Sequence, residues 1–407
     1  MITSHASGVQ LHLTSLPDGR LGSSARQFVD WLQAAGQSVW QVLPLSVPDA
    51  AGSPYKSPSA FAASPELLEH PDAQVSPEEL AAFSEAESYW VGSWAAYGGE
   101  VTDQVRFSRE WADLRAYARA RGVRIMGDIP IYVAPKGADV CAWPSMFRDD
   151  AVAGCPPDAY AATGQLWGNP VYRWDVIAAD GYAWWVERLR RSFELFDYVR
   201  LDHFRGFVDY WEIPAHAETA MEGHWERGPG RALFDAARAE LGTLPILAED
   251  LGDIDAAVID LRRELGLPGM AVLQFGFDPA DAANTHHPDH LRTDQVVYTG
   301  THDNDTVIGW WATLPDVPRD MVRAATRATR VSADVDDEPS WALIELALAS
   351  PCELAMMQAQ DVLALGSEAR MNTPGIEGGW GWQMDPGALT AAHAQRLRGL
   401  TERARRC

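Results

Sequence analysis

Short apolar runs alternate with segments of helical periodicity along this chain. Eight runs have the length and composition of buried strands, at 9–13, 39–43, 124–133, 198–201, 245–248, 271–275, 295–299 and 354–357. Apolar residues at helical spacing occupy segments between many of them, at 28–35, 111–120, 186–196, 231–241, 254–264 and 341–349. Eight strands alternating with helices predict an α/β fold, a (β/α)8 TIM barrel. An open doubly wound sheet is the alternative, which is weakened because no glycine fingerprint follows the first run.

Two connections are too long for a single strand–helix unit. Residues at about 51–110 are rich in Ser, Ala, Pro and Glu, and residues 134–180 are rich in Gly, Pro, Trp and Tyr. We expect residues 1–407 to form one catalytic barrel, with both segments inserted over its C-terminal face.

Composition narrows the class of ligand. The formal net charge is −24, so nucleic acid and anionic membranes are poor partners. No apolar stretch reaches the length of a membrane span, and the N-terminal residues lack the pattern of a secretory signal. The four cysteines have no paired spacing, which argues against a zinc site and favours the reducing cytoplasm. The 17 tryptophans favour a carbohydrate ligand, although any single one is more readily explained as a core residue.

The fourth apolar run ends in a candidate nucleophile. Catalytic side chains of a barrel project from the C-terminal ends of the strands, and Asp202 stands there. Alternation along the strand places Arg200 on the same side as Asp202. A neighbouring guanidinium keeps a carboxylate ionised, as a nucleophile requires. A structural ion pair at the barrel rim explains the same pattern equally well.

The fifth and seventh runs also end in acidic residues. Glu249 and Asp250 follow the fifth run, where burial beside another charge can hold one of them protonated. A helix N-cap is the alternative, and it suits Asp250 better than Glu249. His302, Asp303 and Asn304 follow the seventh run and are candidates for binding sugar hydroxyls. A hydrogen-bonded turn is the alternative here, and a metal site is a weaker one because no spaced set of ligands is present.

Acidic residues after the fourth and fifth strands match the needs of glycoside cleavage. This chemistry uses one ionised and one protonated carboxyl group, which lie about 5–5.5 Å apart in retaining enzymes. Adjacent parallel strands are separated by about 4.8 Å, so side chains that end neighbouring strands can meet this distance.

Several longer motifs resemble the amylomaltase family of 4-α-glucanotransferases, within the wider α-amylase clan. The motifs are LHLTSLP at 11–17, WQVLPL at 40–45, SPY at 53–55, GDIPIYV at 127–133, GQLWGNP at 164–170 and EARMNTPG at 368–375. The resemblance covers nearly the whole chain.

The resemblance implies a role for each matching position. Asp202 is similar to the nucleophile of the family, Glu249 to its acid/base, and Asp303 to a third carboxylate that stabilises the transition state. Arg200 and His302 are similar to residues that orient the nucleophile and bind the same sugar. The resemblance implies neither a metal nor an organic cofactor.

More distant contacts are implied as well. Tyr160, Gln165 and Trp167 match a mobile loop that covers the acceptor site, and Tyr55 lies near a glucan-contacting surface. Asp128 matches the acidic residue after the third strand, for which a structural and a binding role are both open. The chain departs from the pattern at 68–111, which is shorter than a helical subdomain of the family, and at 19–22 and 378–382. These departures affect remote glucan binding and leave the three carboxylates intact.

The expected activity is transfer of an α-1,4-glucan segment to the 4-hydroxyl of an acceptor glucan or of glucose. The expected partners are maltooligosaccharides, amylose and glycogen-derived glucans. Residue patterns alone do not separate this transferase from an α-glucan hydrolase, and that choice rests on the resemblance. A carbohydrate-binding protein without catalysis is a further alternative, and the carboxylates at 202 and 249 argue against it.

Overall fold

Eight parallel strands form one sheet in the computed structural model, which describes residues 5–157, 162–376 and 378–406. Their order is β10-β11-β12-β1-β2-β3-β6-β9, so successive parallel strands of the chain are neighbours except β9 and β10, which stand at the two ends of the order. This arrangement confirms the (β/α)8 barrel. By internal contacts the chain divides into a first unit, residues 1–43, 113–126 and 268–407, and a second unit, residues 44–112 and 127–267.

The first unit contains five strands that are buried at every position. They are β1 (Ala6–Gln10), β2 (Val39–Gln41), β10 (Gly269–Val272), β11 (Gln295–Tyr298) and β12 (Leu354–Gln358). Parallel strands covered on both faces are expected to be apolar throughout rather than alternating. The helices of this unit are α1 (Ser23–Ala34), α10 (Val307–Thr313), α11 (Asp316–Thr329), α12 (Pro339–Leu348), α13 (Ala359–Val362) and α14 (Ala391–Arg403).

Two predicted strands of this unit are displaced along the sequence. The run 9–13 forms a strand that already ends at Gln10, because Leu13–Ser15 close a 3-10 turn. The run 271–275 contributes only its first two residues to β10, because Leu273–Phe275 also form a 3-10 turn. Apolar composition marks a buried segment, but it does not reveal where the backbone leaves the ladder.

The second unit holds β6 (Tyr198–Leu201) and β9 (Ile246–Ala248), which pair in parallel. Its longer helices are α7 (Ala183–Leu195), α8 (Arg231–Leu241) and α9 (Ala256–Glu264), which begins at an Asp255 N-cap. The side chain of Asp255 accepts hydrogen bonds from the first turn of the helix, which stabilises its start. Strand β3 (Arg124–Ile129) and helix α4 (Val101–Ala120) contain residues assigned to both units.

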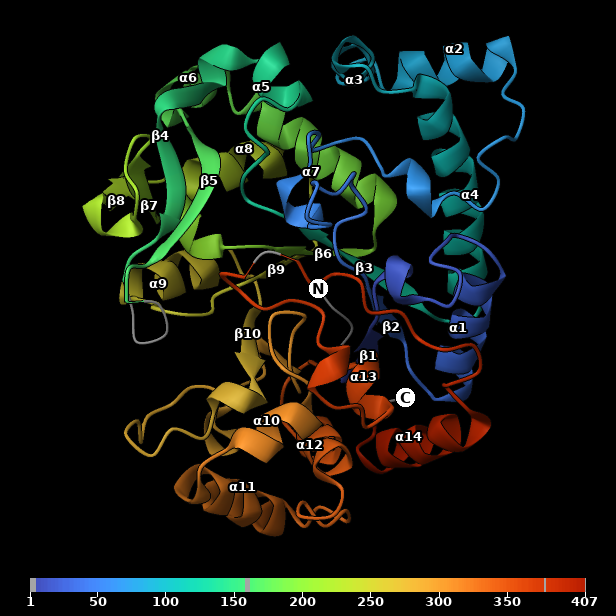
Figure 1. The fold of residues 1–407 in the computed structure, drawn as a ribbon, viewed down its shortest axis with the longest axis vertical. Helices are drawn as coiled ribbons and strands as arrows, with labels where there is room; N and C mark the ends of the chain where they lie inside the picture. The colour runs from blue at the N-terminus through green and yellow to red at the C-terminus, as the bar shows by residue number, and fades with distance from the viewer. Residues whose placement is uncertain (1–4, 158–161, 377, 407) are drawn as a thin grey trace. The chain divides into compact units, whose positions relative to one another are not determined.

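The two long connections contain regular structure of their own. The first includes α2 (Pro77–Ala86), which starts with a Ser76–Glu79 capping box, and α3 (Val91–Tyr97). The second includes α5 (Ala138–Ala142), β4 (Phe147–Cys155), β5 (Gln165–Tyr172) and α6 (Trp174–Ala179). Strands β4 and β5 join β7 (Asp209–Pro214) and β8 (His224–Arg227) in an antiparallel sheet of order β5-β4-β7-β8 (Figure 1).

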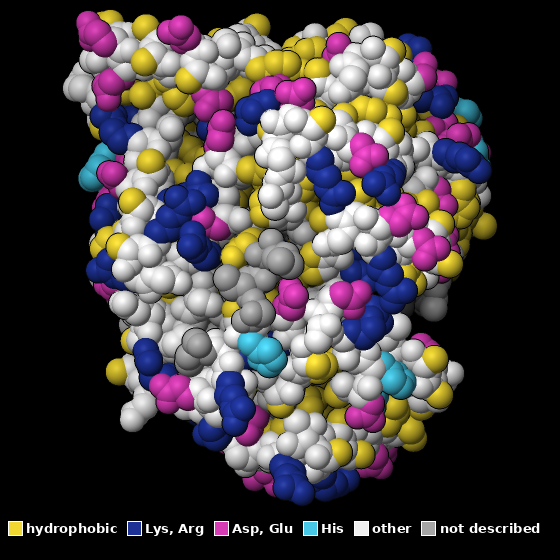
Figure 2. Space-filling view, turned by 180° about the vertical axis from the view of Figure 1, so that it is seen from behind, with side chains coloured by type: hydrophobic (Ala, Val, Ile, Leu, Met, Phe, Trp, Pro, Cys, Tyr) yellow, Lys and Arg dark blue, Asp and Glu magenta, His cyan; other side chains and the backbone are white. Residues whose placement is uncertain are grey.

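Buried tryptophans account for part of the Trp excess. Trp40, Trp184 and Trp185 are fully buried, and the last two pack edge to face at 5.6 Å. Acidic and basic side chains are interspersed over the face shown in Figure 2, so the acidic excess is not gathered there in one patch. Among the described residues, no helix is both long and apolar enough to cross a membrane.

Candidate active site

A single buried guanidinium connects three carboxyl groups at the ends of β3, β6 and β9. Arg200 Nη1 lies 2.9 Å from Asp202 Oδ1 and 2.9 Å from Asp128 Oδ2. Arg200 Nη2 lies 3.9 Å from Glu249 Oε2. The Arg200 side chain is only 4% exposed, whereas that of Asp202 is 26% exposed. Asp202 is therefore the member of this cluster that is most open to a ligand, and alternation along β6 places it beside Arg200 as predicted.

Backbone amides fix the carboxyl group of Glu249. His203 N donates to Oε2 at 2.6 Å, and Leu251 N donates to Oε1 at 2.9 Å. His203 adopts a left-handed conformation with φ of 50°, which is uncommon for a residue with a side chain. This conformation accompanies the sharp turn that follows the strand and directs the amide of residue 203 toward Glu249. Strained backbone is typical of sites where geometry has to be held in place.

Burial controls the protonation of this cluster. It raises the pKa of Glu249 from 4.5 to about 7, against the opposing influence of Arg200, while the charge of Asp202 adds to the rise. Burial likewise raises the pKa of Asp128 from 3.8 to about 7, again opposed by Arg200. Near neutral pH the cluster thus holds protons on carboxyl groups that would be fully ionised in water.

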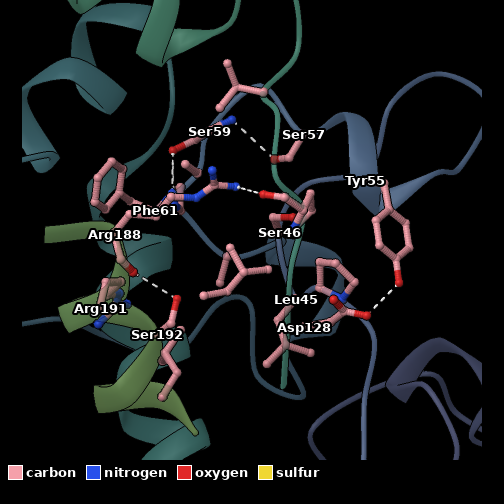
Figure 3. Close-up of a pocket in the computed structure, with 18 of the residues that line it drawn as sticks. Leu45, Ser46, Tyr55, Ser57, Ser59, Phe61, Asp128, Arg188, Arg191 and Ser192 are labelled. Atoms are coloured by element: carbon pink, nitrogen blue, oxygen red, sulfur yellow. Dashed lines mark hydrogen bonds between the residues drawn. The ribbon is translucent and has the colours of Figure 1, made fainter. Parts of the chain in front are cut away.

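Asp128 is enclosed, and its side chain is 0% exposed. Its Oδ2 accepts a hydrogen bond of 2.8 Å from the Tyr55 hydroxyl, as the close-up in Figure 3 shows. A cavity of about 50 Å³ adjoins this pair and extends to Arg188 and Ser192 of α7. The Arg188 guanidinium donates to the carbonyls of Pro130 and Ile131, which follow Asp128 along the chain. This enclosure favours the structural role of Asp128, namely to hold Arg200, over direct contact with sugar.

The loop matched to the acceptor site is described in part. Trp167 packs edge to face on the His203 ring at 4.9 Å, and its Nε1 donates to Gln165 Oε1 at 3.0 Å. Burial lowers the pKa of His203 to about 4, so this ring is neutral at physiological pH. Trp167 is thereby placed next to the residue that follows Asp202. Tyr160 lies outside the described residues.

Within the first unit, the segment after β11 contains the third predicted carboxylate. Asp303 Oδ2 lies 3.4 Å from His302 Nε2, and Asn372 Nδ2 donates to Asp303 Oδ1. Arg370 donates to the backbone carbonyl of Asp303. The Asp303 side chain is 38% exposed and so remains accessible while its neighbours hold it.

Asn304 closes a turn in the same segment. Its Oδ1 accepts hydrogen bonds from the backbone and the hydroxyl of Thr301, at 2.8 and 2.9 Å. The amide oxygen is thus engaged in the turn, which was the alternative role for this residue. Among the described residues, no three His, Cys, Asp or Glu side chains converge as a metal-binding group would require.

Two residues that hold the candidate carboxyl groups in place were not identified from the sequence. His203 acts through its backbone amide, and a left-handed φ at a residue other than glycine leaves no sequence signal. Asn372 lies in the motif at 368–375, but only the folded chain brings it to Asp303. His12 is buried beside His302, and burial lowers its pKa to about 3.

An eight-stranded (β/α)8 barrel with an Asp and a buried Glu at the ends of its fourth and fifth strands defines a glycoside-cleaving barrel enzyme. Comparison with known proteins specifies the family. A family model described as 4-alpha-glucanotransferase matches residues 11–88 and 99–390. The chain belongs to this family, whose members transfer α-glucan segments.

Individual relatives agree with this assignment. The chain is 39% identical to the 4-alpha-glucanotransferase of Thermus thermophilus, over 98% of each protein. It is 38% identical to the chloroplastic/amyloplastic 4-alpha-glucanotransferase of Arabidopsis thaliana, over 93% of this chain and 81% of that protein. The amylomaltase of Streptococcus agalactiae in complex with acarbose superposes with a TM-score of 0.91, at 30% identity and 99% coverage of both chains.

Proposed function

We propose that this 4-α-glucanotransferase works by double displacement, with Asp202 as the nucleophile and Glu249 as the acid/base. The observation that carries the proposal is the Arg200 guanidinium, which contacts both carboxyl groups within one buried cluster. Asp202 combines an ion pair with solvent access, as a nucleophile requires. Glu249 combines burial with a pKa of about 7, as a residue that both gives and takes a proton requires.

In the first half-reaction, Asp202 attacks the anomeric carbon while Glu249 protonates the glycosidic oxygen. The bond to the leaving glucan breaks, and a covalent glycosyl–Asp202 ester forms. In the second half-reaction, Glu249 removes the proton from the 4-hydroxyl of the acceptor. The acceptor oxygen attacks the anomeric carbon, the bond from that carbon to Asp202 breaks, and Asp202 leaves as a carboxylate. The product keeps the α configuration because the carbon is inverted twice.

Asp303 and His302 are proposed to bind hydroxyls of the sugar at the reacting bond. Asp303 is held by Asn372 and Arg370, so its carboxylate needs little reorganisation when a sugar binds. His302 is buried at 4% exposure, with Nε2 directed toward Asp303. A negative charge fixed in this way stabilises the positive charge that develops on the ring in the transition state.

Transfer exceeds hydrolysis only where the acceptor is bound and water is kept out. We assign Trp167 to this task, because its indole stands against His203, next to the nucleophile. Gln165 fixes the indole nitrogen and thus the orientation of the ring. Tyr55 is assigned to the support of Asp128 rather than to acceptor binding.

The proposed donors are maltooligosaccharides, amylose and glycogen-derived glucans, and glucose or a glucan is the acceptor. A structural relative, the amylomaltase of Streptococcus agalactiae, binds acarbose, which supports a ligand-binding site on this fold. We place the reaction in the cytoplasm. Cys141 and Cys352 are free thiols, which agrees with a reducing compartment.

Incubation with maltotriose alone tests the proposal. We expect free glucose together with a ladder of glucans longer than the substrate. Products that are only shorter than maltotriose would indicate an α-glucan hydrolase. Unchanged maltotriose would contradict catalysis by the cluster around Arg200.

A further inference from the structure

The antiparallel sheet β5-β4-β7-β8 carries a patch of exposed apolar side chains that the mechanism does not use. Strand pairing aligns Leu166, Gly154, Trp211 and Trp225 in one row across the four strands. Residues directly opposite each other in an antiparallel sheet point to the same face. Trp225 is 38% exposed and Leu166 is 43% exposed. These two side chains lie on the outer strands of the sheet, with the buried Gly154 and the half-buried Trp211 between them, and the exposed indole of Trp225 is a candidate binding surface.

The Trp225 ring is held rigidly from two sides. It packs edge to face on Trp211 at 5.2 Å and 74°. The guanidinium of Arg205 lies 4.1 Å from the ring centroid. Arg205 is itself fixed by ion pairs to Asp209 at 3.0 Å and to Asp255 at 3.1 Å. A ring that is already fixed loses little conformational entropy when a ligand stacks on it.

Polar groups surround this apolar ring. Strand β8 is the last strand of its sheet in the described part of the chain, and all four of its residues are exposed. Figure 1 shows it at the margin of that sheet. Arg227 lies two residues beyond Trp225 on the same face and pairs with Asp209 across the strands. A flat apolar surface beside hydrogen-bond donors matches a pyranose ring, which has apolar C–H faces and hydroxyls at its edge.

We propose that Trp225 is a second glucan-contact site, which stacks on a neutral pyranose ring of a long α-glucan away from the reacting bond. The proposal rests on the action of the family on α-glucans. The net charge of −24 disfavours polyanionic ligands, whereas a neutral polysaccharide meets no such penalty. Long glucans gain binding from this contact, and glucans that fill only the cleavage site do not.

A protein partner is the alternative ligand for the surface around Trp225. A nearby exposed residue, Met221, allows an experiment to distinguish a protein partner from a glucan. Met221 is 61% exposed and follows Ala220, whose carbonyl accepts the hydrogen bond of Trp211 Nε1. A protein interface uses a flexible apolar side chain such as methionine as readily as an indole. Stacking of a sugar requires the flat ring of Trp225 and does not require Met221.

The test compares Trp225→Ala and Trp225→Phe with the matched control Met221→Ala. Glycogen affinity is measured by electrophoresis through glycogen-containing gels, and kcat/KM is measured with maltotriose. We expect Trp225→Ala to weaken glycogen affinity about five- to tenfold, as expected for one stacking contact, while kcat/KM for maltotriose stays within about twofold. Trp225→Phe retains a flat ring and should be intermediate, and Met221→Ala should match the wild type in both assays.

Three results would overturn the proposal. The first is unchanged glycogen affinity in Trp225→Ala. The second is an equal loss with maltotriose, which would show an effect transmitted through Arg205 to the segment that carries Asp202. The third is a joint effect of Trp225→Ala and Met221→Ala accompanied by a smaller mass in light scattering, which would identify an interface between copies of the chain. An inactive wild type would contradict the catalytic proposal alone, because glycogen affinity is measured without turnover.

Discussion

Replacing Glu249 by glutamine tests two consequences of burying this carboxyl group, its proposed role as a general acid and its effect on the stability of the fold. The change removes the proton that the leaving sugar needs, and it also removes a charge that the buried site holds at a cost. General acid help contributes roughly 10²–10⁴-fold where the leaving group is poor. We therefore expect Glu249→Gln to lose about this factor with maltotriose and far less with maltosyl fluoride, because fluoride departs without a proton.

The stability effect has a sign that follows from the raised pKa. The folded-state pKa of about 7 exceeds the ordinary value of 4.5, so the native state binds the proton more tightly than the unfolded state. The contribution of Glu249 to wild-type stability must then fall as pH rises from about 4.5 to about 7. The pKa difference between the folded and unfolded states, at 1.36 kcal/mol per pKa unit, lowers the free energy of unfolding by roughly 3 kcal/mol once Glu249 is fully ionised.

Glutamine also has a cost that does not depend on pH. Both oxygens of Glu249 accept backbone amides, from His203 and from Leu251. The NH2 group of glutamine faces one of these donors and leaves it without an acceptor, at a cost of about 1–3 kcal/mol. The informative quantity is therefore the difference in ΔΔG between two pH values, in which this constant cost cancels.

Urea unfolding at pH 5 and at pH 8 measures that difference. We expect Glu249→Gln to be less stable than the wild type at pH 5 and to recover up to about 3 kcal/mol of relative stability at pH 8. Glu240→Gln, at an exposed position of α8, serves as the matched control and should show no such dependence. Equal ΔΔG values for Glu249→Gln at both pH values would refute the raised pKa, and equal losses with both donors would refute the acid role.

Further outcomes follow from the same geometry. Asp202→Asn should lower kcat by at least about 10³-fold while the fold survives, and a slow fluorinated glucosyl donor should label the Asp202 peptide in mass spectrometry; a label on another peptide would contradict the assignment. In the wild type, kcat/KM should fall as pH rises through about 7, the pKa of Glu249, and a constant value up to pH 9 would argue against it. Trp167→Ala should increase hydrolysis relative to transfer, measured as the ratio of reducing ends to longer products, and an unchanged ratio would leave Trp167 as a packing residue. The short segment 68–111 should give a weak rise of kcat/KM from maltotriose to maltoheptaose and few cyclic products from amylose, whereas a steep rise or abundant large rings would refute this expectation.

This chain is shorter than a relative that it matches over nearly its full length. The alignment with the Thermus thermophilus enzyme spans 492 positions, more than the 407 residues of this chain, so that relative contains segments absent here. The family model is interrupted at 89–98, inside this segment. Substrate-length dependence is the measurement that tests the expectation for segment 68–111, which contains α2 and α3.

The barrel strands were predictable because parallel strands buried on both faces are short, uniformly apolar runs. All eight runs overlap strands of the barrel. The ends of β1 and β10 differ where a 3-10 turn follows, and β2 and β3 end before the apolar runs at 39–43 and 124–133 end. The strands β7 and β8 were not predicted. Strand β8 is exposed at all four residues, so hydrophobic patterning carries no signal there. Its pairing with β7 is accompanied by tertiary contacts, among them the edge-to-face packing of Trp225 on Trp211.

The candidate site residues that follow a strand could be placed from the sequence because the strands themselves could. The contacts that hold these residues in place could not be predicted. Asp202 and Glu249 each come directly after a strand whose predicted end, at residue 201 and at residue 248, agrees with the structure. The amide of His203 and the side chain of Asn372 reach their partners through loop conformation. Loop conformation is set by the assembled structure, so neither contact has a local signature.

The charge balance of the cluster explains why one of its carboxyl groups can serve as an acid. Three carboxyl groups, those of Asp128, Asp202 and Glu249, share one guanidinium. If all three were ionised, the buried cluster would carry a net charge of −2, which burial makes costly. Burial of these charges raises the pKa of the two most enclosed groups to about 7, so they take up protons, while the more exposed Asp202 keeps its ion pair. Burial, only partly offset by the single Arg200 guanidinium, thereby holds on Glu249 the proton that we propose it donates in the first half-reaction.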